Sequence, residues 1–223
     1  DSSVTGVQTC ALPILFLYAT SRAEKKVRAL SCSKEPWTVA WLERVAEPGR
    51  VVYDIGANVG PYTLIAAHRV GSGGHVYAFE PGYATFAHLC DNIVLNGCQD
   101  RVTPLSIPLS ARTGMARFAY HMLFPGHARH AGLEAGSLVG ESAPAYEQPV
   151  PAMRLDDVVR LFVLAPPQVL KIDVDGAEVM VLEGAGDTLR GAQLTHVLIE
   201  IDQQNDAVVV DLMQAAGFRL ADR

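Results

Sequence analysis

The chain has 223 residues, of which 49% are hydrophobic and 19% are charged, and its formal net charge is −6. This composition is typical of one globular domain and excludes a disordered chain. The basic residues form no block, so we expect no nucleic-acid partner. Cys10, Cys32, Cys90 and Cys98 form no C-x-x-C pair, which favours free thiols in a reducing, cytoplasmic setting.

The N-terminal region contains no membrane-spanning segment. Its longest apolar run, ALPILFLYA at 11–19, is shorter than the ~20 residues that a span needs, and no basic segment precedes it. The preceding sequence VTGVQTCALPI at 4–14 resembles the in-frame translation of a sequencing adapter. We therefore interpret residues 1–14 as an artefact, 15–46 as an N-terminal helical segment and 47–223 as the main domain.

Strands and helices are predicted to alternate through the main domain. The predicted strands lie at 51–55, 75–81, 101–110, 113–120, 168–176 and 195–202, with the start of another at 217–223. The predicted helices lie at 61–70, 83–96, 177–189 and 206–216, and Phe86, Leu89, Ile93 and Leu95 are expected to face inward in the second. Residues 121–148 are interpreted as a loop. The alternation predicts a mostly parallel, doubly wound α/β sheet wrapped by helices.

The turn in VVYDIGANVGPYTL, at 51–64, is the first candidate site. It follows a strand, and ligands of open parallel sheets bind beyond the carboxyl ends of the strands. Gly56 and Gly60 would let the backbone approach a ligand closely. Glu80 ends the next strand, 20 residues after Gly60, where a carboxylate can accept the hydroxyls of a ribose.

The nature of the cofactor follows from what this turn contains. It lacks the third glycine of the dinucleotide fingerprint G-x-G-x-x-G, and Asp54 precedes its first glycine. An acid there disfavours a pyrophosphate and favours an ammonium or sulfonium group. S-adenosylmethionine carries both, and a ribose. A bare α/β turn and a nicotinamide cofactor are the alternatives.

Five segments carry a resemblance to the FkbM-type methyltransferases. They are EPGRVVYDIGANVGPYTL, VYAFEPG, RLDDVV, LKIDVDGAEVMVLEGA and HVLIEID, which fall in order between residues 47 and 202. Asp175 stands where family members usually have Glu. The resemblance implies a class I methyltransferase fold that is Rossmann-like, and methyl transfer to a hydroxyl of a sugar or polyketide-type small molecule.

The resemblance also implies roles for individual residues. Asp54, Gly56, Asn58 and Gly60 would line the methionine end of the cofactor, and Glu80 would hold its ribose. Asp173, at the end of the LKID strand, is the first candidate for a catalytic base, and Glu200 is the second. Asp173 could instead accept a hydrogen bond from cofactor or substrate.

Other polar residues are interpreted without a catalytic role. No metal is expected: His121, His127 and His130 are read as solvated loop residues, and Asp156 and Asp157 as acids at a helix N-terminus. Lys171 could pair with an acid of the site or simply flank the sheet.

The C-terminus is expected to lack the last strand of the family fold. Only 22 residues follow Ile201, enough for one helix and at most one strand, so we expect a gene fragment. The alternative function is therefore a catalytically silent S-adenosylmethionine-binding module or fragment.

Overall fold

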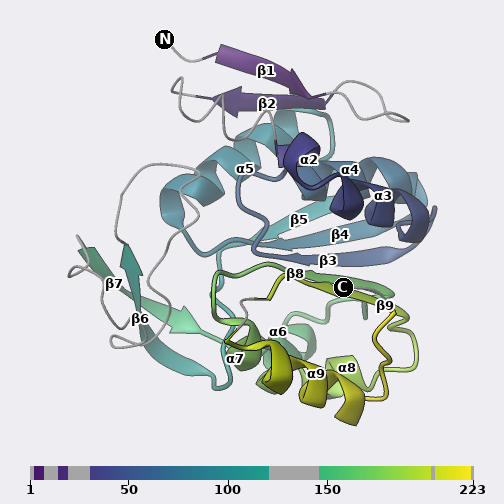
Figure 1. Ribbon diagram of the computed structural model, residues 1–223. Coiled ribbons are helices and arrows are strands. Elements are labelled where there is room, and N and C mark those ends of the chain that lie inside the picture. Colours follow the sequence, from purple (N-terminus) through teal and green to yellow (C-terminus); the bar gives the residue numbers. More distant parts are fainter. Residues whose placement is uncertain (1–2, 8–14, 20–30, 121–145, 202–203, 222–223) are drawn as a thin grey trace. The chain divides into compact units, whose positions relative to one another are not determined.

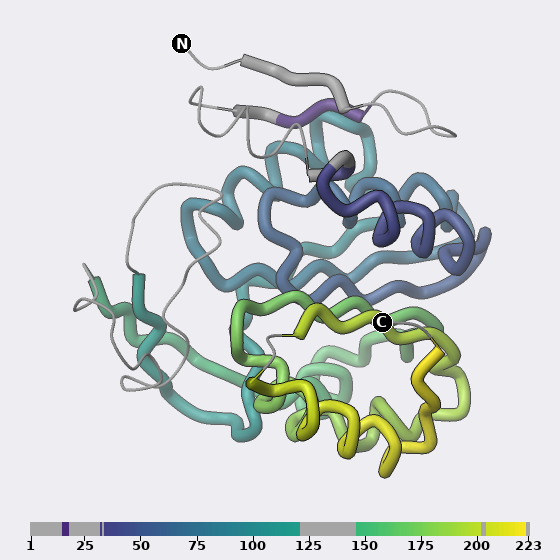
Figure 2. Tube along the Cα trace, in the orientation of Figure 1, coloured from purple at the N-terminus to yellow at the C-terminus, as the bar shows by residue number. Residues whose placement is uncertain are grey.

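The computed structural model describes residues 3–7, 15–19, 31–120, 146–201 and 204–221. They fall into two compact units, one within residues 1–106 and the other within residues 107–223. Figure 2 traces the same chain by residue number. The predictions for Cys10, His121, His127 and His130 concern residues outside the described ones.

The first unit contains a three-stranded parallel sheet in the order β5-β4-β3. The strands are β3 (Val51–Ile55), β4 (His75–Phe79) and β5 (Val102–Leu105), and the helices are α2 (Ser31–Lys34), α3 (Pro36–Val45), α4 (Pro61–Val70), α5 (Tyr83–Leu95) and the 3-10 turn η1 (Gly71–Gly73). Figure 1 shows α2 to α5 over one face of this sheet. Tyr53, Phe79, Leu64 and Leu89 are at most 1% exposed and form its core.

Strand β2 (Leu15–Ala19) pairs antiparallel with β1 (Ser3–Val7). The sequence places residues 15–19 within the predicted helical segment, but they form a strand. Leu15 and Leu17 are buried whereas Phe16 is 43% exposed, the two-residue alternation of a strand with one covered face. Helices α2 and α3 confirm the helical prediction further along that segment.

The second unit contains two separate sheets. Strands β8 (Val169–Ile172) and β9 (His196–Ile199) pair in parallel, and β6 (Gly114–Tyr120) and β7 (Tyr146–Ala152) form an antiparallel ribbon. Its helices are α6 (Leu155–Leu161), α7 (Glu178–Glu183), α8 (Gly186–Leu189) and α9 (Asp206–Ala215). β7 begins inside the predicted loop, at Tyr146.

Three local predictions were wrong. Leu95 was expected to face inward but is 41% exposed, because it lies two residues after buried Ile93, on the opposite side of α5. The helix at 177–189 is broken at Gly184, where a Cβ atom would collide with the carbonyl oxygen of Ser110. Residues 218–221 form no strand.

Two further properties follow from the described residues. Cys32, Cys90 and Cys98 are free thiols, as predicted, and burial raises the pKa of Cys32 to about 11. Within the described part of the chain, no helix is long and apolar enough to cross a membrane.

Candidate active site

The loop after β3 is shaped by three residues with positive φ angles. These are Gly56 (81°), Asn58 (52°) and Gly60 (93°), a region of backbone space that favours glycine and asparagine. The loop also crosses the end of β4, because the N–H groups of Gly56 and Ala57 donate to the carbonyl oxygen of Phe79 at 3.0 and 2.9 Å. The loop therefore has a defined shape at the carboxyl ends of two neighbouring strands.

Glu80 joins this loop to the one that follows β4. Its side chain is 4% exposed. One carboxylate oxygen accepts the N–H of Asn58 at 3.0 Å, and the other accepts the N–H of Gly82 at 2.7 Å. These bonds hold the Glu80 carboxylate between the loop after β3 and the loop after β4.

Asp54 is buried and contacts the helix that follows the loop. It is 2% exposed, and the hydroxyl of Thr63 in the first turn of α4 donates to its carboxylate at 2.5 Å. The side chain of Asn58 stays local, since its oxygen accepts the N–H of Val59 at 2.9 Å. Asn92 of α5 donates to the carbonyl oxygen of Val59 at 2.7 Å.

Thr63 and Asn92 were missed by the sequence analysis. The sequence feature that could have identified them is a polar residue on an otherwise apolar helix face. Asn92, for example, is fully buried and lies between the inward positions of Leu89 and Ile93. A buried amide needs hydrogen-bond partners, and here one partner is the carbonyl oxygen of Val59 in the loop after β3.

All five predicted cofactor residues thus lie in the first unit. Asp54 is in β3, the loop after β3 carries Gly56, Asn58 and Gly60, and Glu80 directly follows β4.

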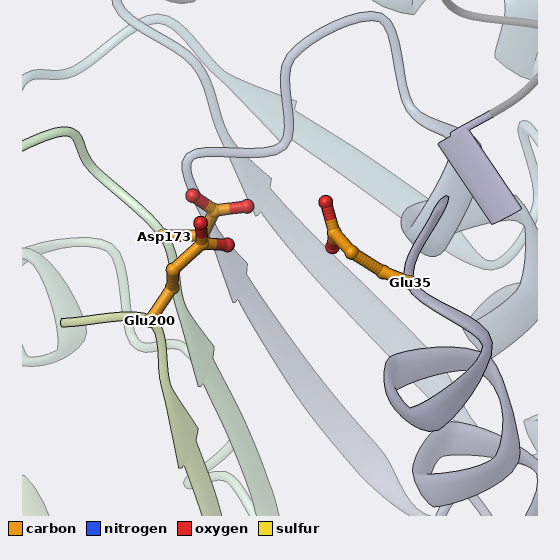
Figure 3. Close-up of side chains that lie close together, drawn as sticks. All are labelled: Glu35, Asp173 and Glu200. Carbon is orange, nitrogen blue, oxygen red and sulfur yellow. The ribbon is translucent and has the colours of Figure 1, made fainter. Parts of the chain in front are cut away.

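Both predicted catalytic acids lie in the second unit, each directly after a strand. Asp173 follows β8 and Glu200 follows β9. Figure 3 shows their carboxylates next to one another, and a carboxylate oxygen of each lies within 4.8 Å of the other. The strand register continues between them, because the N–H of Glu200 donates to the carbonyl oxygen of Ile172 at 2.9 Å.

Lys171 pairs with Asp173, which decides between the two interpretations of this lysine. Its ammonium lies 3.0 Å from the Asp173 carboxylate, and the side chains are 4% and 28% exposed, respectively. A buried ammonium requires a charged partner. The pair holds the Asp173 carboxylate in one place while leaving part of it open to solvent.

Glu178 is a further acid that the sequence analysis did not single out, although it lies within the LKIDVDGAE segment. It is 2% exposed, and its carboxylate accepts the N–H of Gly176 at 2.8 Å and the side-chain amide of Asn205 at 3.2 Å. Asp175 and Gly176 have φ angles of 49° and 99°. Glu178 therefore connects the turn after β8 to the start of α9.

Asp156 has a structural role in addition to its place in the first turn of α6. It is 8% exposed, and its carboxylate accepts the N–H groups of Asp187 and Thr188 at 3.0 and 2.9 Å. These groups lie in the first turn of α8, whose N–H groups need external acceptors. Asp156 thus caps α8 from a neighbouring helix.

Comparison with known proteins adds the family. Residues 54–220 match the family described as the methyltransferase FkbM domain. The 31-O-demethyl-FK506 methyltransferase FkbM of Streptomyces tacrolimicus is 30% identical over 194 residues, which cover 77% of this chain and 73% of that protein. The hexuronic acid methyltransferase AglP of Haloferax volcanii is 28% identical over 156 residues, which cover 70% of this chain and 57% of that protein.

A solved structure supports the fold. The SAM-dependent methyltransferase from Agrobacterium tumefaciens superposes with a TM-score of 0.52 at 10% identity, over 96% of this chain and 57% of that one. At such low identity the similarity concerns the fold alone, and it confirms the predicted class I α/β architecture. The family match confirms the predicted methyltransferase function with S-adenosylmethionine as methyl donor. The chain belongs to the FkbM methyltransferase family.

Proposed function

We propose that this protein methylates a hydroxyl group of a small molecule, such as a sugar or a polyketide-type compound. The names of the two relatives support this acceptor class. The chain spans 73% of the length of one relative and 57% of the length of the other. The acceptor class is therefore a proposal for this protein and is not taken over from either relative. The observation that carries the proposal is the Asp173–Glu200 carboxylate pair at the ends of β8 and β9.

The donor is assigned to the loop after β3. When bound, S-adenosylmethionine supplies an electrophilic methyl group. Gly56, Asn58 and Gly60 shape the loop that would receive its methionine end, and Glu80 would accept hydrogen bonds from the ribose hydroxyls. Asp54, bonded to Thr63, would hold the loop against α4.

Asp173 is assigned as the base. A carboxylate that removes the proton from the acceptor hydroxyl makes the oxygen a better nucleophile, an effect of roughly 10²–10⁴-fold on rate. Asp173 is partly exposed and is held by Lys171, so it can be both reached and oriented. Glu200, within 4.8 Å, is the second candidate and could bind the same hydroxyl.

Two variants measured side by side test these assignments. Asp173→Asn should lower kcat by about 10²–10⁴-fold on sugar and polyketide hydroxyls, while calorimetry shows nearly unchanged S-adenosylmethionine binding. Glu80→Ala should weaken that binding by about tenfold or more, because a charged hydrogen bond contributes roughly 1.5–3 kcal/mol. Unchanged turnover in Asp173→Asn would remove Asp173 as the base. Cofactor binding without turnover on any acceptor would favour a silent binding module.

A further inference from the structure

A tyrosine and a glutamate meet where the cofactor loop enters α4. Tyr62 lies two residues after Gly60, in the first turn of α4, and is 7% exposed. Its phenol O–H donates to a carboxylate oxygen of Glu35 at 2.7 Å. Glu35, labelled in Figure 3, immediately precedes α3 and is half-buried. Both residues belong to the first unit, as does the cofactor loop.

The orientation of Glu35 is not explained by the needs of its own helix. Glu35 occupies the N-cap position of α3, where an acid would normally accept an N–H from the first turn. In the described structure its side chain makes no such capping bond and bonds to Tyr62 of α4 instead. A stabilising cap is thus forgone, and a carboxylate is held at the exit of the cofactor loop.

Glu35 offers its carboxylate oxygens beside the loop after β3, because Tyr62 is in the first turn of the helix that this loop enters. A carboxylate suits a ring that carries several hydroxyls, because its oxygens accept hydrogen bonds from adjacent hydroxyls. An acceptor must reach the methyl donor on this loop, so its binding groups belong nearby.

We infer that Glu35, oriented by Tyr62, binds the acceptor, and that it selects a neutral polyhydroxylated ring over an anionic one. This inference rests on the proposed hydroxyl methylation. Tyr62 engages one carboxylate oxygen of Glu35, and the acceptor positions that remain can receive adjacent hydroxyls of the ring. A uronate would bring a second carboxylate close to Glu35, and this repulsion would disfavour it. Tyr62 is a positioning residue, because it acts through Glu35.

The experiment compares methyl glucoside with methyl glucuronide as acceptors. Wild type should have the lower KM for the glucoside. Glu35→Gln should raise that KM about tenfold, as expected for the loss of a charged hydrogen bond, and should narrow the difference between the two acceptors. Tyr62→Phe should change KM in the same direction by a smaller factor. Neither variant should alter kcat or S-adenosylmethionine affinity by more than about twofold.

Glu47→Gln is the matched control. Glu47 follows α3 and forms an exposed ion pair with Arg50 at 2.5 Å, so its loss should leave both KM values unchanged. Weaker S-adenosylmethionine binding in Glu35→Gln with unchanged acceptor KM would overturn the inference, because Glu35 would then hold the ammonium of the cofactor. Unchanged parameters in both variants would also overturn it, leaving a purely structural pair.

A second measurement separates this inference from the proposed function. If wild type methylates neither sugar, each sugar is titrated into the protein saturated with S-adenosylhomocysteine. Glucoside binding that Glu35→Gln abolishes would support the inference even though the proposed reaction had failed. Binding that is equal in wild type and variant, or absent from both, would overturn it.

Discussion

Replacing Gly60 by alanine should destabilise the protein through two separable effects. Gly60 has a φ angle of 93°, and a residue with a Cβ atom pays about 1–2 kcal/mol in the left-handed region. The added Cβ would also lie 2.7 Å from Cδ1 of Leu89, a side chain that is fully buried. Overpacking of a filled core costs roughly 1–3 kcal/mol. The expected loss in the free energy of unfolding is therefore about 2–5 kcal/mol.

Gly97→Ala separates the two effects. Gly97 also has a positive φ angle, 62°, but nothing lies within 4 Å of the position of its Cβ. In Gly97→Ala the free energy of unfolding should fall only by the backbone cost, about 1–2 kcal/mol. Equilibrium urea unfolding of both variants gives the comparison, and the excess loss in Gly60→Ala measures the contact with Leu89. Equal losses would show that Leu89 moves aside at no cost and would refute the packing argument.

Two further predictions concern residues away from the cofactor loop. Asp156→Ala should lower the free energy of unfolding by about 1–3 kcal/mol, because it leaves N–H groups of α8 without their acceptor. The control is Asp187→Ala, at a side chain that is 84% exposed, which should change the free energy of unfolding by no more than about 0.5 kcal/mol. Similar losses in the two variants would contradict the capping role of Asp156. Burial lowers the pKa of His75 from 6.5, against a weaker opposing effect of Asp100. The folded state therefore prefers the neutral imidazole, and this residue's share of stability falls as pH drops below 6.5 towards the lower folded pKa. The urea midpoint should fall less between pH 7.5 and 5.5 in His75→Gln than in wild type, and an equal fall would exclude His75 as the cause.

The shape of the loop after β3 could be predicted from sequence because its determinants are local. Gly56 and Gly60 adopt positive φ angles, as the spacing of glycines after a buried strand indicates. Glu80 follows β4 directly, so its place at a strand end was visible in the VYAFEP segment. In each case the residue type restricts the backbone or ends a hydrophobic run within a few positions.

The bonds that fix the second unit could not be predicted in the same way. Glu178 bonds to Asn205, 27 residues away, and Asp156 bonds to Thr188, 32 residues away. The sequence around Glu178 or Asp156 does not indicate which residue its carboxylate bonds to. The break of the helix at Gly184 also depends on a residue that is distant in sequence. A side chain at this position would collide with the backbone of Ser110.

The four acids at or near the carboxyl ends of strands divide by exposure into two kinds. Asp54 and Glu80 are 2% and 4% exposed, and both are bonded to groups of the loop and its flanking helix. Asp173 is 28% exposed at its side chain, and Glu200 is exposed. A base must come within hydrogen-bond reach of the proton that it removes. A buried carboxylate that accepts backbone N–H groups stabilises a binding loop, whereas a solvent-facing carboxylate held by a single ammonium can meet an incoming hydroxyl. Strand position alone does not distinguish these four acids from one another. Their exposure and hydrogen bonding do, and these two properties favour Asp173 for proton transfer.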